Sequence, residues 1–285
     1  MITSDLVRQR VRTLPSLPTT VVSLGQAVAD DRCSVDRILN ILAKDPALSA
    51  TMLRLANSVM YGGDQRVMDL RTAVMRLGFE ALLNLGRTAA IIRSFRGTNH
   101  LDPMRLWQHC VAVGLVSKGI CRLLRQNSMD ESAYLAGLLH DIGKIALDTC
   151  FPEAYTSVLQ KVEEGAFFVD AEREVLGMDH AEAGALLAAN WSFPQPIIEV
   201  IRVHHNPGPD DFLPNLIHLS DLLVRTRIPM GPADERLMIS FDDLPAFKAV
   251  LAGALHKDLD VERMTFSIDD EVDHALAFVE VAFQA

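Results

Sequence analysis

The chain has 285 residues, of which 49% are hydrophobic but only 6% aromatic, and its formal net charge at pH 7 is −10. This length is enough for one large or two modest domains with a sizeable core, and the negative charge argues against a nucleic-acid partner. The sequence has neither an apolar run long enough for a transmembrane helix nor a signal-peptide pattern, so we expect a cytoplasmic protein with no membrane contact.

Helical spacing of apolar residues begins in the N-terminal third of the chain. Ser34 is the expected N-cap of one helix, and Asp45 followed by Pro46 is the expected start of the next. The pair Gly62 and Gly63 then breaks the pattern, and Gly78 should end or kink a helix in the following stretch. Residues 97–103, "GTNHLDP", are the best candidate for a boundary between subdomains.

The remainder of the chain also has the pattern of helices. A long helix should run from Met104 to about Gln126, and another should carry "ESAYLAGLLHD". No stretch alternates with a period of two residues, so we expect no sheet and predict an all-α fold. Further helices should begin around Phe151, Asp170, His180, Pro194 and Leu213.

The cysteines do not indicate a disulfide framework or a metal-binding Cys motif. The four of them are widely spaced and form no CxxC pair. We interpret them as reduced thiols of a cytosolic protein. They are Cys33, Cys110, Cys121 and Cys150.

The stretch "GLLHDIGK", residues 137–144, places His140 directly before Asp141. A neutral imidazole and a carboxylate are suitable ligands for Zn, Fe, Mn or Ni. Lys144 follows one helical turn later, where it could face a phosphate held at such a metal, or could be an ordinary exposed lysine.

Further ligand-type residues occur before and after this stretch. Any single histidine among them has a simpler explanation as a polar residue with satisfied hydrogen bonds. Asp221 is different, because an aspartate in an apolar helix is costly unless it is paired or bound to a metal. His204 and His205 can face one site only if their helix ends there, which "HHNPGPDD" indicates. The further candidates are His109, His180, His204, His205 and Asp221.

The series H…HD…H…HH…D resembles that of the HD superfamily, and specifically of the HDOD family of bacterial signalling output domains. The strings "LPSLPTTVVSLGQAV", "ILAKDPALSATMLRLANSVMYG", "AVMRLGFEALLNLG", "AYLAGLLHDIGK" and "LGMDHAEAGALLAANWSFPQPIIEVIRVHHNP" extend the resemblance over roughly residues 12–226. It implies an N-terminal helical bundle (1–98) packed on an HD-like helical core (99–226). Residues 227–285, which are rich in acidic side chains, are our own prediction of a helical extension.

The resemblance also implies how the ligands would be shared. His109, His140, Asp141 and Asp221 would hold one metal, and Asp141 would bridge to a second metal completed by His180, His204 and His205. Lys144 matches the lysine that faces substrate phosphate in related phosphodiesterases. The chain lacks the GYP loop of the HD-GYP enzymes that cleave cyclic di-GMP, has Asn206 where these enzymes have an acid, and has Arg105 where some relatives have an extra glutamate ligand.

Three functions are compatible with this pattern. The resemblance favours a regulatory signal-transduction module with little or no catalytic activity, acting on an unidentified signalling protein, whose HD site is structural or vestigial. The complete ligand series also allows a metal-dependent phosphohydrolase, with Lys144 as a catalytic residue and a nucleotide or cyclic dinucleotide as substrate. A metal or redox sensor is the third possibility. The expected cofactor is one or two divalent transition metals (Fe, Zn, Mn or Ni), and removing Asp141 is expected to relieve repulsion with Asp221 in the metal-free protein.

Overall fold

The computed structural model describes residues 2–57, 66–95, 99–230, 240, 243–253 and 261–283. These residues form helices joined by turns and short irregular segments, and none of them lies in a strand. The predicted all-α fold is therefore confirmed. Within the described part of the chain, no helix combines the length and apolar character that crossing a bilayer would need.

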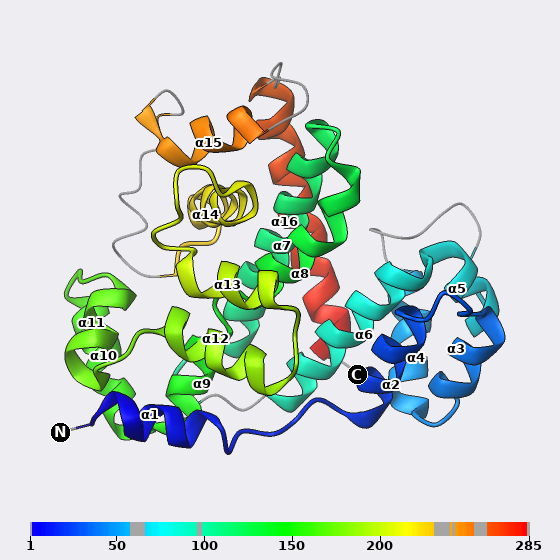
Figure 1. The fold of residues 1–285 in the computed structure, drawn as a ribbon, viewed down its shortest axis with the longest axis horizontal. Coiled ribbons are helices and arrows are strands. Elements are labelled where there is room, and N and C mark those ends of the chain that lie inside the picture. Colours follow the sequence, from blue (N-terminus) through cyan, green and yellow to red (C-terminus); the bar gives the residue numbers. More distant parts are fainter. Residues whose placement is uncertain are drawn as a thin grey trace. The chain divides into compact units, whose positions relative to one another are not determined.

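The chain forms two compact units (Figure 1). The larger unit comprises Met1–Leu14 and Gly97–Asp273, and the smaller unit comprises Pro15–Arg96 and His274–Ala285. The predicted division at 1–98, 99–226 and 227–285 stays a prediction. The helices that begin in the larger unit are α1 (Ser4–Val11), α7 (Pro103–Leu123), η1 (Asn127–Met129), α8 (Asp130–Leu139), α9 (Ile142–Cys150), α10 (Pro152–Glu163), α11 (Phe168–Leu176), α12 (His180–Asn190), α13 (Gln195–Val203), α14 (Phe212–Arg225), α15 (Pro245–Gly253) and α16 (Val261–Phe283).

The smaller unit shows the helix ends that the sequence predicted. Ser34 Oγ accepts a hydrogen bond from the Arg37 backbone N–H, and Asp45 caps the next helix in the same way. Gly78 separates two helices with a positive φ of 78°, a conformation that favours glycine. The predicted break at Gly62 and Gly63 lies outside the described residues. The helices are α2 (Thr19–Val28), α3 (Val35–Leu42), α4 (Pro46–Ala56), α5 (Leu70–Leu77) and α6 (Phe79–Ser94), and α16 ends in this unit.

In the larger unit, two pairs of glycines let helices approach more closely than side chains would permit. A Cβ on Gly137 of α8 would lie 2.7 Å from the backbone of Gly114 in α7. A Cβ on Gly143 of α9 would lie 1.9 Å from the His180 carbonyl oxygen and 2.6 Å from the Gly184 nitrogen in α12. These two contacts hold α7 against α8 and α9 against α12.

Replacing Gly143 by alanine should therefore destabilise the larger unit. Overpacking of a core commonly costs about 1–3 kcal/mol, and we expect at least the upper part of that range because the clash is with backbone atoms. Gly119→Ala in α7 is the matched control, since its Cβ would meet only ordinary contacts at 3.7 Å or more and alanine favours the helix. Urea unfolding measures both variants, and equal stability of the two would contradict this account.

Candidate metal centre

The ligand-type residues predicted from the sequence converge in the larger unit, most of them at helix ends. His140 follows the last residue of α8, and His204 follows the last residue of α13. His180 is the first residue of α12. Asp141 occupies the N-cap position of α9, but its carboxylate makes no capping hydrogen bond and so remains available to the site. His109 and Asp221 project from within α7 and α14.

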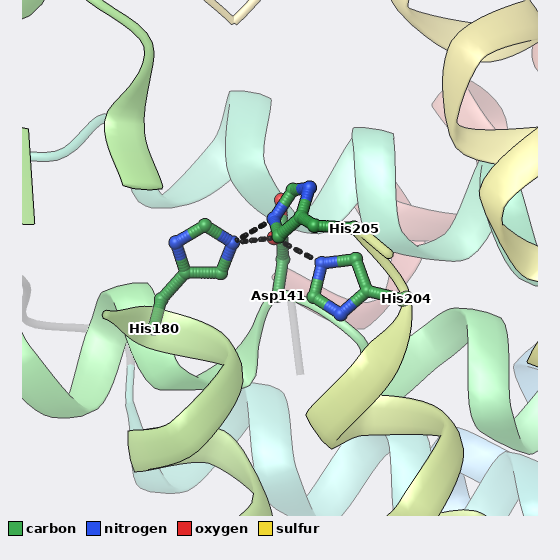
Figure 2. A group of neighbouring side chains, drawn as sticks. All are labelled: Asp141, His180, His204 and His205. Atoms are coloured by element: carbon green, nitrogen blue, oxygen red, sulfur yellow. Dashed lines mark hydrogen bonds and ion pairs between the residues drawn. The ribbon is translucent and has the colours of Figure 1, made fainter. Parts of the chain in front are cut away.

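One cluster is formed by Asp141, His180, His204 and His205 (Figure 2). Figure 2 shows the Asp141 carboxylate between the rings of His180 and His204, with the ring of His205 overlapping it in this view. Asp141 Oδ1 lies 3.1 Å from His180 Nε2 and 3.8 Å from His204 Nε2. His205 Nε2 lies 2.7 Å from His180 Nε2. The adjacent histidines reach one site because α13 has already ended, as the sequence indicated.

A second cluster is formed by His109, His140 and Asp221, all buried. Asp221 Oδ1 lies 3.1 Å from His109 Nε2 and 3.7 Å from His140 Nε2. The other carboxylate oxygen of Asp141, Oδ2, lies 3.7 Å and 3.5 Å from the same two nitrogens. Asp141 therefore presents one oxygen to each cluster.

The hydrogen bonds around the clusters fit a metal ion. The Nδ1 atoms of His140 and His204 lie 2.7 Å from the carbonyl oxygens of Gly137 and Ile201. An N–H donated there leaves the lone pair of Nε2 directed into the site, which is the tautomer of a metal-bound histidine. His204 Nε2 is buried without a hydrogen-bond partner among the described residues. Both clusters could thus hold a metal ion.

In the metal-free chain, the histidines divide into two electrostatic classes. Burial favours the neutral form of His180, but the Glu172 and Asp141 carboxylates outweigh it and raise its pKa to about 9. The pKa of His140 is also raised, because Asp141 and Asp221 outweigh its burial. Burial, together with repulsion from neighbouring histidines, lowers the pKa values of His204 and His205.

Lys144 is buried, so the interpretation of this residue as an exposed helix lysine is wrong. Its Nζ lies 2.5 Å from Asp141 Oδ2 and 4.6 Å from the centre of the Phe168 ring. Burial opposes the charge on Lys144, but the Asp141 carboxylate raises its pKa overall, so that the ammonium persists. Burial alone would raise the pKa of the Asp141 carboxyl. The neighbouring charges of Lys144, His140 and His180 outweigh burial and hold this pKa well below its usual range.

Glu172 is fully buried in α11 and was not among the residues predicted from the sequence. Its Oε2 accepts hydrogen bonds from the His180 backbone N–H at 2.8 Å and from Nδ1 of the same residue at 2.6 Å. Its Oε1 accepts a hydrogen bond from the Tyr155 hydroxyl at 3.0 Å. A carboxylate behind a histidine orients the ring and raises its basicity toward a metal. The sequence pattern that selected Asp221, an acidic residue on an apolar helix face, is also present here. Glu172 shares such a face with Val169 and Leu176.

A cavity of about 480 Å³ reaches this centre. Lys144, His180, His205 and Asp221 lie on its wall, together with Asn206, which stands where the cyclic di-GMP enzymes have an acid. Arg105, the other departure, is turned to the Pro229 carbonyl oxygen, to which it donates a hydrogen bond.

Residues 14–207, more than half of the sequence, match the pattern of the HDOD domain. The chain belongs to the HDOD family. An HDOD domain protein of unknown function from Geobacter sulfurreducens has a similar crystal structure, with a TM-score of 0.81, 25% identity and 99% of both chains covered. A candidate phosphohydrolase from Shewanella amazonensis SB2B has a TM-score of 0.78 and 25% identity, with 97% of both chains covered.

A curated relative of this HDOD chain is an uncharacterized protein of Treponema pallidum (strain Nichols). The two are 28% identical over an alignment of 219 residues, and the match covers 73% of the HDOD chain. The match covers only 41% of the Treponema protein. The HDOD chain therefore spans about two fifths of the length of this relative.

The metal-free HDOD protein should be most stable near pH 6.5. The pKa of His180 is raised from 6.5 to about 9, so its stabilising contribution is complete below pH 6.5 and is lost as the pH rises to 9, on the order of 3 kcal/mol. The pKa values of His109, His204 and His205 are lowered in the folded chain. Below pH 6.5 these histidines take up protons more readily in the unfolded chain, so the free energy of unfolding decreases as the pH falls. Urea unfolding of chelated protein across pH 5–9.5 measures both changes.

Glu172→Gln should reduce the alkaline loss, because it removes the charge that raises the pKa of His180. Glu174→Gln is the matched control, since Glu174 is an exposed residue of the same helix and pairs with Lys161. Wild-type stability that is flat from pH 6.5 to 9 would contradict this assignment, as would an equal effect of the two substitutions.

Proposed function

We propose that this HDOD chain is a signal-transduction output module whose HD site holds one or two divalent transition metals as part of its fold. The observation that carries the proposal is the convergence of seven ligand side chains on two adjacent clusters, with one oxygen of Asp141 directed to each. Imidazole nitrogens and carboxylate oxygens in this mixture suit Fe, Mn, Zn or Ni.

A metal at this position would contribute directly to stability. Asp141 and Asp221 are two carboxylates in an apolar helical core, and a buried charge is costly unless it is compensated. A ligand that binds only the folded chain stabilises it by RT ln(1 + [L]/Kd), or about 4 kcal/mol at 1,000 times the Kd. The same site would make the fold of the module responsive to metal supply.

Phosphohydrolysis is the second candidate function, and the cavity favours it. The cavity exposes ligands of both clusters to a molecule from outside, and Lys144 lies on its wall. Bound metals would supply Lewis acidity and activate water for attack on phosphorus. Lys144 and Arg225 would hold the phosphoryl oxygens and balance their charge. The similar fold of the Shewanella candidate phosphohydrolase agrees with this role.

Protein purified without a histidine tag should contain near-stoichiometric transition metal by elemental analysis, and Asp141→Asn should lose it together with several degrees of melting temperature. Asp210→Asn, at an exposed position, should change neither. The metal-free variant should be less stable than metal-free wild type, because Lys144 loses its partner. The expected relief of repulsion with Asp221 is thus replaced by an unpaired buried ammonium. Less than about a tenth of an equivalent after metal-supplemented expression would overturn the metal proposal.

The two candidate functions differ in turnover. The regulatory function predicts little hydrolysis of cyclic di-GMP or of a chromogenic phosphodiester when Mn or Fe is supplied without oxygen, because Asn206 replaces the acid and the GYP loop is missing. A kcat of about 1 s⁻¹ or more, within the ordinary range of enzymes, would establish the phosphohydrolase instead. In that case Lys144→Ala should lose activity but keep its metal.

A further inference from the structure

The cavity beside the metal centre has two chemically different parts. The first part, which we call the floor, comprises the ligands His180, His205 and Asp221 together with Lys144 and Arg225. The outer wall of the cavity is formed by the junction of α10 and α11, where Phe167 is 56% exposed next to Phe168. Phe167 is thus an apolar side chain that lines the cavity and is accessible from solvent.

With metal ions bound, the floor of the cavity would have a net positive charge and would favour an anionic ligand. Asp141 and Asp221 contribute two negative charges. Two divalent metal ions would carry more positive charge than these two carboxylates neutralise. Lys144 pairs with Asp141, and Arg225 lies 3.6 Å from Asp221, so both cations face carboxylates that the metals would neutralise. A compact anion with several oxygens, such as phosphate, matches this excess of positive charge.

The residues of the wall are complementary to a flat group with a polar edge. The exposed ring of Phe167 offers a surface for stacking. Asp170, which only accepts hydrogen bonds when ionised, and Arg173, which only donates them, line the same cavity. A nucleobase has both a flat face and an edge with donors and acceptors, whereas a simple phenyl group has only the face.

We propose that this cavity binds a nucleoside monophosphate, with the phosphate at Lys144 and Arg225 over the metal centre and the base against Phe167. The volume of about 480 Å³ lies in the lower part of the range for small-ligand sites, which is sufficient for one nucleotide. The site would serve as a sensor pocket in a regulatory module or as a substrate pocket in a hydrolase. The proposal rests on the metal centre proposed above.

The test is calorimetric titration of the manganese-loaded full chain with inorganic phosphate, phenyl phosphate and AMP, with released phosphate assayed in the same samples. AMP should bind at least tenfold more tightly than either of the other two anions, or should be hydrolysed. Phe167→Ala should weaken AMP binding about tenfold, equivalent to about 1.4 kcal/mol, and leave inorganic phosphate binding unchanged. Phe266→Ala, at another exposed phenylalanine, should change neither.

Three results would overturn the proposal. Equal affinities for phosphate and AMP would show that the wall does not recognise the base, and would leave the proposed metal centre unaffected. Equal binding of phenyl phosphate and AMP would leave an apolar wall without base recognition. Failure of the chain to hold manganese or any other transition metal would overturn both the metal centre and the ligand proposed for it.

Discussion

Two carboxylates buried in an apolar helical core set the main physical constraint on this protein. Asp141 and Asp221 cannot be left without compensation, and the chain surrounds them with Lys144, Arg225 and imidazoles. In the metal-free state, protonated His180 supplies part of the positive charge, and the pKa of His140 is raised by the two carboxylates. Metal ions and protons therefore compete for the same place, which makes metal affinity depend on pH.

The helical framework serves this centre. Ligands at helix ends can approach from different directions, whereas side chains along one helix face are restricted to one direction. The glycine contacts bring α7 against α8 and α9 against α12, and these four helices carry His109, the His140–Asp141 junction and His180. Glu172 then holds His180 from behind through two hydrogen bonds. The ring is fixed by a network that extends to Tyr155, and its orientation does not depend on a bound ion.

The sequence predicted the all-α fold and several helix caps because those features depend on local periodicity and on single capping residues such as Ser34. It also selected the seven residues that the structure brings together, since their order resembles a known series. Glu172 was missed because its importance lies in a contact with His180 that only tertiary packing creates. The burial of Lys144 was left open for the same reason, because one helical turn fixes its direction from Asp141 but not what covers it. The cavity could not be predicted, since its walls come from several helices that lie far apart in the sequence, between Lys144 and Met230.

The division of the chain into units has a consequence for its synthesis. The smaller unit combines residues 15–96 with the stretch that begins at His274, where Ala275, Phe278 and Val279 are buried. A ribosome makes these two parts with residues 97–273 between them. The smaller unit therefore stays incomplete until α16 has left the exit tunnel, although most of its residues emerge before residue 97. Truncation before His274 thus removes core residues from a unit whose other residues are 15–96.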